Sequence, residues 1–231
     1  MKIKRKKSER GFADYGWLKT FHTFSFSEYY DPNWMGFGPL RVINEDSIAG
    51  GGGFPTHGHK DMEIITFVTK GALQHRDSIG NESVIRPGEI QKMSAGTGIQ
   101  HSEFNASKTE LTHLYQIWIV PRKKSLIPSY HQTVYSDRLQ SNSLLLLASD
   151  HKLDNHIYVE QDLRLSLGRF ARGYREVIPL SPQRLYWIQI VSGGCNQDLE
   201  SGDGLAIQDE TELVLNFELD TEFLFFDMGH P

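Results

Sequence analysis

Residues 57–71 read His-Gly-His-Lys-Asp-Met-Glu-Ile-Ile-Thr-Phe-Val-Thr-Lys-Gly, and this stretch predicts a β-rich fold. Its part 62–68 is dense in β-branched and aromatic side chains and ends at Lys70-Gly71, which is typical of a strand followed by a turn. Similar short runs recur along the chain, separated by turn signals such as Gly80-Asn81 and Arg86-Pro87-Gly88. Many short strands at turn-spaced intervals predict an all-β sandwich or barrel.

The two halves of the chain show the same order of features. Residues 63–71 can be laid on 186–194, and residues 87–94 on 203–210. A duplicated β domain accounts for both matches. In this alignment of the two halves, four apolar residues of the second half take the positions of four polar residues of the first. Leu180, Pro182, Phe217 and Leu219 align with His57, His59, His101 and Glu103, respectively.

Residues 121–133 separate the halves. They carry Pro121, Pro128 and a Lys/Arg cluster without clear periodicity, which predicts an inter-domain connection. We therefore expect an N-terminal domain over residues 1–125 and a C-terminal domain over residues 135–231.

Composition limits the function classes. The 231 residues include 24 Lys and Arg against 29 Asp and Glu, a net charge of −5, which disfavours direct nucleic-acid binding. The basic run Lys2–Lys7 is interpreted as a frayed, solvated N-terminus. The single Cys195 excludes a disulfide within the chain and a thiolate-rich metal site. With no apolar run behind the N-terminus and none long enough to span a membrane, we expect a cytoplasmic protein.

Two short clusters point to a metal site. His57-Gly58-His59 and His101-Ser102-Glu103 each place two metal-capable side chains at i and i+2, which share one face of a strand. Two neighbouring strands of this kind would aim three imidazoles and one carboxylate at a single point. Such nitrogen and oxygen ligands suit Fe(II) and also Mn, Ni, Cu or Zn, so the residues alone leave the metal open.

The same residues resemble known motifs. Gly51, His57-Gly-His59, Glu63 and Gly71 are similar to the first cupin motif, and Pro87-Gly88, Gly98, His101 and Asn105 to the second. More narrowly, the chain resembles the pirin family, bicupins that include bacterial quercetinase-like proteins. Further segments carry this resemblance: Trp17 with His22-Thr-Phe-Ser-Phe26, Tyr30-Asp-Pro32, Gly36–Asn44, His75-Arg-Asp-Ser78 and Ser94–Glu103.

The resemblance implies two cupin-type β barrels in tandem. It implies one divalent metal, usually iron, in the N-terminal barrel, with His57, His59, His101 and Glu103 as ligands. The apolar residues that the internal alignment places at these four positions predict a C-terminal barrel without metal. In the general cupin pattern the motif-one glutamate, here Glu63, binds the metal. By parity Glu63 shares the strand face of the two histidines but lies four residues beyond His59, so we expect it behind the ligands.

Two functions are compatible with such a site. The resemblance suggests a metal-dependent dioxygenase that cleaves flavonols such as quercetin, with dioxygen as second substrate and Glu103 or Glu63 as general base. The alternative is a non-enzymatic, redox-sensing regulator that docks a protein partner. His22, His75 and His113 are interpreted as structural. The same holds for an aromatic set that we assign to packing: Phe21, Phe24, Phe26, Tyr29 and Tyr30.

Overall fold

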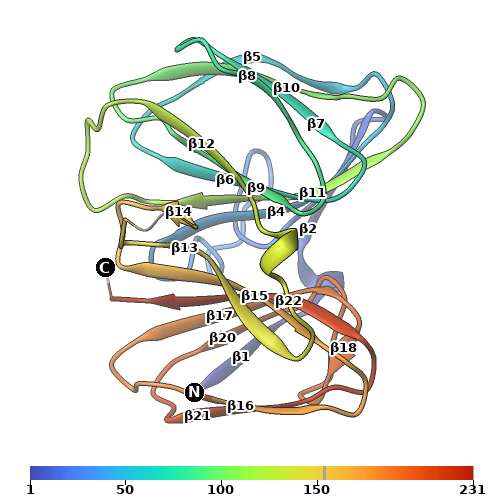
Figure 1. Cartoon of the computed structure of the whole chain (residues 1–231), viewed down its shortest axis with the longest axis vertical. Coiled ribbons are helices and arrows are strands. Elements are labelled where there is room, and N and C mark those ends of the chain that lie inside the picture. Colours follow the sequence, from blue (N-terminus) through green and yellow to red (C-terminus); the bar gives the residue numbers. More distant parts are fainter. Residues whose placement is uncertain (153–154, 231) are drawn as a thin grey trace.

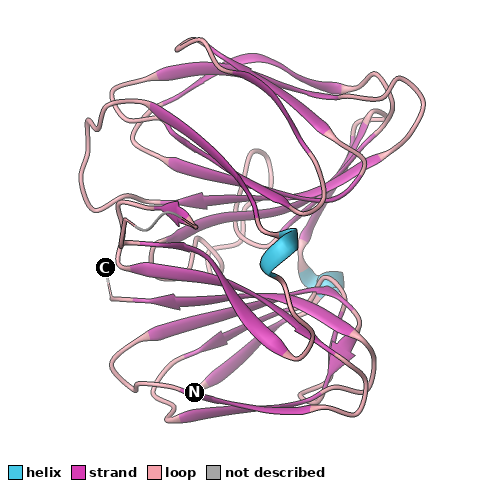
Figure 2. Cartoon of the chain, viewed as in Figure 1, coloured by secondary structure: helices cyan, strands magenta, loops and turns pink. Residues whose placement is uncertain are grey.

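Strands run through the chain from end to end (Figure 2). The computed structural model describes residues 1–152 and 155–230. Within them the only helices are two three-residue 3-10 turns, η1 (Lys7–Glu9) and η2 (Ser136–Arg138). Neither turn is long enough to cross a membrane, and the described residues contain no other helix that could.

The N-terminal barrel is built from two antiparallel sheets. Its strands are β2 (Gly11–Asp14), β3 (Leu18–His22), β4 (Leu40–Ile48), β5 (Gly53–His59), β6 (Glu63–Lys70), β7 (Leu73–Asp77), β8 (Glu82–Ile85), β9 (Glu89–Ser94), β10 (Ile99–Asn105), β11 (Thr112–Ile119) and β12 (Ser129–Val134). The larger sheet has the order β12-β9-β6-β11-β4-β3-β2, and the smaller has the order β5-β10-β7-β8. The smaller sheet closes the barrel on the side away from the second domain (Figure 1).

The C-terminal barrel repeats this plan. Its strands are β13 (Ser143–Ser149), β14 (Ile157–Tyr158), β15 (Leu163–Phe170), β16 (Arg175–Pro179), β17 (Leu185–Ser192), β18 (Gly194–Cys195), β19 (Leu199–Glu200), β20 (Gly204–Ile207), β21 (Glu212–Asn216) and β22 (Thr221–Met228). Its seven-stranded sheet begins with the N-terminal strand β1 (Lys2–Arg5) and has the order β1-β20-β17-β22-β15-β13-β14. The predicted all-β fold of two barrels in tandem is therefore confirmed.

The seven-stranded sheets of the two barrels face each other. One cluster of buried side chains spans both, with Ile65 and Tyr115 from the first barrel and Leu165 and Phe226 from the second. Trp187 is fully buried there, with ring centroids 5.2 Å from Phe24 and 5.9 Å from Trp34. Burial of these apolar side chains between the sheets stabilises the two barrels as a pair, by about 25 cal/mol for each Å² of apolar surface removed from water.

Two strands, β1 and β12, pair across the predicted limits of the N-terminal domain. β1 pairs with β20, so the chain starts in the C-terminal sheet, where Figure 1 shows the blue strand among orange ones. The basic run is therefore not frayed: Arg5 is 3% exposed and its Nε donates to the Thr23 carbonyl oxygen. The predicted connection contains β12, which pairs with β9 of the N-terminal barrel.

The two barrels share one strand order. β6 pairs with β9 and β11, and β17 pairs likewise with β20 and β22, as the internal alignment predicted. Strand β21, which follows β20 as β10 follows β9, buries Leu213 and Leu215 in an apolar cluster. The detailed offsets were wrong for Pro182 and Leu219, which are exposed in turns at strand ends rather than inside the barrel.

Candidate metal centre

Strands β5 and β10 bring three histidines together. In their antiparallel register His101 lies opposite His57, and Ile99 lies opposite His59. The ring centroids of the three imidazoles are 4.4 to 4.9 Å apart. One nitrogen of each ring lies within 4.8 Å of the others, so the predicted convergence of His57, His59 and His101 is present in the fold.

The ring nitrogens are oriented for a cation. His57 Nδ1 lies 2.8 Å from the Pro55 carbonyl oxygen, which can only accept a hydrogen bond, so Nδ1 carries the hydrogen and Nε2 keeps its lone pair. That Nε2 lies 3.0 Å from His101 Nε2. Two imidazole nitrogens that bind one ion at about 2.1 Å are about 3.0 Å apart when they occupy adjacent octahedral positions. One ion could therefore contact both nitrogens.

The environment keeps two of these rings neutral. Burial, together with the neighbouring His57, lowers the pKa of His59 to about 4. Burial and the imidazoles of His57, His59 and His75 lower the pKa of His101 to about 2. Since a metal binds the unprotonated ring, both nitrogens are available to an ion at neutral pH.

Glu103 lies on β10 past a register shift that separates it from His101. Its Oε2 accepts a 2.8 Å hydrogen bond from Gln116 Nε2, and Gln116 Oε1 accepts one of 3.1 Å from Trp118 Nε1. The carboxyl is 1% exposed, and burial, together with the nearby Asp46 carboxyl, raises its pKa to about 7. Trp118 thus fixes the direction of Gln116, and Gln116 fixes that of Glu103.

His75 belongs to this centre and was missed from the sequence. Potential ligand atoms of His75, His101 and Glu103 lie within 4.8 Å of one another, so His101 is shared between two groups. His75 Nε2 lies 3.1 Å from Asp77 Oδ2, while Nδ1 of His75 and of His101 are buried without a hydrogen-bond partner among the described residues. The i, i+2 spacing of His75 and Asp77 was the available signal, because β7 pairs with β10.

Glu63 lies elsewhere, so its predicted place behind the ligands is wrong. It begins β6 in the larger sheet, whereas His57 and His59 are on β5 in the smaller one. Its Oε1 accepts hydrogen bonds from Lys92 Nζ (3.0 Å) and Ser94 Oγ (2.9 Å), and its Oε2 accepts one from the Glu160 backbone N–H (2.8 Å). Glu63 therefore ties the two domains together.

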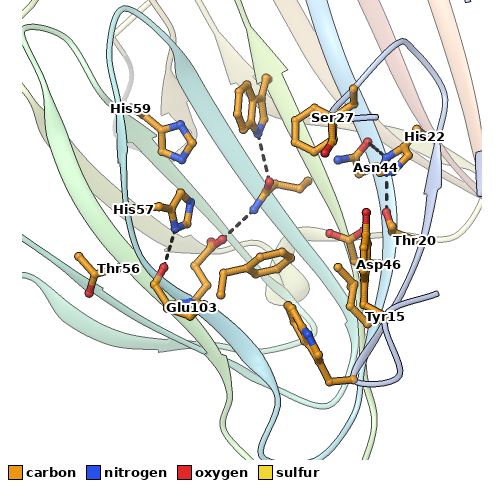
Figure 3. Close-up of a pocket in the computed structure, with 17 residues that line it drawn as sticks. Tyr15, Thr20, His22, Ser27, Asn44, Asp46, Thr56, His57, His59 and Glu103 are labelled. Atoms are coloured by element: carbon orange, nitrogen blue, oxygen red, sulfur yellow. Dashed lines mark hydrogen bonds between the residues drawn. The ribbon is translucent and has the colours of Figure 1, made fainter. Parts of the chain in front are cut away.

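A cavity of about 630 Å³ opens beside the histidines. Figure 3 shows His57, His59 and Glu103 on one side and Asp46, Thr20, Asn44 and Tyr15 on the other. Aromatic rings line much of the remaining wall: Trp17, Phe26, Phe54 and Trp118. The volume lies within the range of about 300–1,000 Å³ that is usual for small-molecule sites.

The aromatic and histidine assignments are partly changed by this cavity. Phe26 lines it and meets Trp118 edge-on at 5.4 Å, so it is a wall residue as well as a packing residue. His22 also faces the cavity, and its Nδ1 is paired with Asn44 Oδ1 at 2.8 Å, as a structural histidine would be. His113 is held by Thr69 Oγ1 and lies 3.3 Å from Glu45 Oε1, which fits its structural interpretation.

Comparison with known proteins agrees with this geometry. Residues 4–119 match the pirin family, and residues 146–228 match the quercetinase C-terminal cupin domain. A protein of Escherichia coli strain K12 named quercetin 2,3-dioxygenase is 46% identical over 227 residues, which cover 97% of each chain. The chain belongs to the pirin family. A pirin-like protein of Caulobacter vibrioides is 38% identical to this pirin, over 94% of this chain and 95% of its own.

Solved structures give the same result for the whole chain. The crystal structure of YhhW from Escherichia coli matches this pirin with a TM-score of 0.95 and 44% identity, over 100% of this chain and 99% of that one. The structure of bacterial pirin YhhW in complex with nickel(II) matches with a TM-score of 0.94 and 44% identity, over 100% of both chains. A divalent metal therefore fits both the donor set of this pirin and its relatives.

Proposed function

We propose that this pirin is a metal-dependent dioxygenase that cleaves flavonols such as quercetin, with Fe(II) as the expected ion. One observation carries the proposal: His57, His59 and Glu103 line one side of an aromatic-lined cavity of about 630 Å³, and the buried His101 converges with the two histidines and, together with His75, with Glu103. The names of the related proteins support the same substrate class.

His57, His59, His101 and Glu103 would hold the ion. Bound there, it would supply Lewis-acid stabilisation of the substrate enolate and a redox centre for dioxygen. The hydrogen bond from His57 Nδ1 to the Pro55 carbonyl sets the direction of one ligand nitrogen. The edge-on contact of Trp118 with His59, 4.9 Å between ring centroids, restricts the rotation of a second ligand.

Glu103 is the group best placed to take the proton of the flavonol 3-hydroxyl. It lines the cavity, and a base with a pKa near the working pH transfers protons most effectively. In the metal-free protein, burial and the nearby Asp46 carboxyl raise its pKa to about 7, and a bound ion would lower the pKa from there. Gln116 donates to Oε2 and so fixes the orientation of the carboxyl beside the histidines.

The aromatic wall would bind and orient the flat ring system. Trp17 and Phe54 pack edge-on, with ring centroids 5.1 Å apart, and Phe26 and Trp118 form a second such pair. Edge-on aromatic pairs present a rigid apolar surface that excludes water from the reacting centre. A planar polyphenol buries its rings there while its oxygen-bearing edge faces the histidines.

The experiment is dioxygen uptake by iron-loaded protein on addition of quercetin, corrected for the metal content of each variant. We expect His101→Ala to abolish uptake. Glu103→Gln is expected to lower turnover by about 10²–10⁴-fold beyond any loss of metal, because it removes the base.

Glu63→Gln is the matched control, since it makes the same change at a glutamate outside the cavity and should retain turnover per bound metal. If turnover falls only in proportion to metal content in Glu103→Gln, Glu103 is not the base. If no flavonol is consumed by fully loaded wild type, the dioxygenase proposal fails.

A further inference from the structure

Asp46 is a buried carboxyl that the proposed chemistry does not use. It lies on β4, lines the same cavity as the histidines, and is 2% exposed. Its Oδ1 is buried and has no hydrogen-bond partner among the described residues. Because an unsatisfied buried oxygen destabilises a fold, its presence in a ligand cavity calls for a partner.

The neighbouring strands offer Asp46 one polar side chain, the Thr20 hydroxyl, which interacts with the carboxyl but leaves Oδ1 without a partner. Asp46 lies between Thr20 on β3 and Leu114 on β11 in the sheet register. Leu114 is apolar and belongs to a buried cluster with Ile48. Among residues 1–152 and 155–230 no arginine or lysine lines this cavity, so these residues give the carboxyl no ion-pair partner within its walls.

Asp46 also lies across the cavity from the ligand histidines. Figure 3 shows Asp46, Thr20 and Tyr15 on the opposite side from His57 and His59, with aromatic side chains between the two groups. A ring system that spans the cavity would meet the histidines at one end and the Asp46 carboxyl in the wall at the other. In an aromatic-lined site, the ligand group that suits a carboxyl oxygen is a hydroxyl, which donates a hydrogen bond to it.

We infer that Asp46 forms a specificity subsite that accepts a hydrogen bond from a phenolic hydroxyl of the substrate, at the end of the ring system remote from the metal-binding edge. This inference rests on the proposed flavonol function. It assigns the metal-binding edge of the substrate to the histidines and hydroxyl recognition to Asp46. The enzyme would then prefer flavonols with a second hydroxylated ring position over those without one.

The test compares three ligands that share the 3-hydroxy-4-keto edge: 3-hydroxyflavone, 3,7-dihydroxyflavone and 3,4'-dihydroxyflavone. Their dissociation constants are measured by equilibrium titration of the nickel-loaded protein under argon, so that turnover plays no part. One of the two dihydroxy compounds is expected to bind wild type about 10- to 100-fold more tightly than 3-hydroxyflavone, the effect of a hydrogen bond to a charged group.

Asp46→Leu should remove that preference, so that 3-hydroxyflavone and both dihydroxyflavones bind the variant equally. Because all three ligands share the metal-binding edge, any effect of Asp46 on Glu103 changes their affinities together and cancels in the comparison. Asp46→Asn retains an acceptor oxygen and should keep part of the preference. Metal content and thermal unfolding of each variant establish that the fold is retained.

The outcomes separate the two proposals. If all three ligands bind wild type equally, or if the preference survives in Asp46→Leu, the subsite is refuted while the flavonol function stands. If none of the ligands binds the nickel-loaded wild type, the flavonol function is refuted and the subsite with it. A preference that is confined to wild type, and partly kept in Asp46→Asn, supports the inference.

Discussion

Replacing Glu103 by glutamine should change how the metal affinity of this pirin depends on pH. The pKa of Glu103 is raised to about 7 from an ordinary value of 4.5, so the carboxyl holds its proton at pH values where an exposed glutamate is ionised. An ion that binds the carboxylate must displace this proton. Below pH 7 each unit of acidification therefore weakens wild-type binding about tenfold through this group.

The magnitude follows from the fraction of ionised carboxyl. That fraction falls about 100-fold between roughly pH 8 and pH 5, which corresponds to about 2.7 kcal/mol. The histidines remain in Glu103→Gln, so the ratio of wild-type to variant affinity isolates the carboxyl. We expect this ratio for Ni(II), measured by competition with a chelator, to fall about 100-fold over this interval. A glutamate with an ordinary pKa would change the ratio by less than about twofold, and that result would refute the reasoning.

Three further changes test other parts of the structure. His75→Asn should lower Ni(II) affinity about 10- to 100-fold in the same chelator assay, because the ring centroids of His75 and His101 are 5.3 Å apart and Asp77 holds the His75 ring in place. An unchanged affinity would show that His75 is purely structural. Asp46→Leu should raise the melting temperature measured by calorimetry, since it removes an unpaired buried oxygen that costs about 1–3 kcal/mol; a lower melting temperature would mean that Asp46 stabilises the barrel. Deletion of residues 1–5 should lower the free energy of unfolding by about 3–5 kcal/mol in urea titration, because β1 fills an edge of the C-terminal sheet and Arg5 is buried; a loss below about 1 kcal/mol would contradict this pairing.

Local patterns in the sequence were sufficient for the fold class and for the central histidines. Strand propensity and turn residues predicted the strands, and i, i+2 parity placed His57, His59 and His101 on facing strands, as the register of β5 and β10 bears out. The duplicated strand order could be predicted because β6 and β17 have similar buried sequences and similar neighbours.

What failed depends on contacts that are distant in sequence. The prediction for Glu63 assumed that the alternation of side chains along a strand continues from His59 to Glu63. A turn interrupts this alternation, because Asp61 has a positive φ of 50° and the chain crosses there to the other sheet. The pairing of β1 with β20 joins residues about 200 positions apart, which no local pattern reveals. His75 was interpreted as structural because its meaning depends on the register of β7 with β10.

The central claim is that the histidine centre and its cavity cleave flavonols with dioxygen. The most direct measurement is the amount of dioxygen consumed and of carbon monoxide released when fully iron-loaded wild type is given quercetin. We predict one carbon monoxide for each dioxygen and each quercetin consumed, and neither gas change with His101→Ala. Binding of quercetin without consumption of dioxygen would contradict the claim and would favour the regulatory, non-enzymatic alternative.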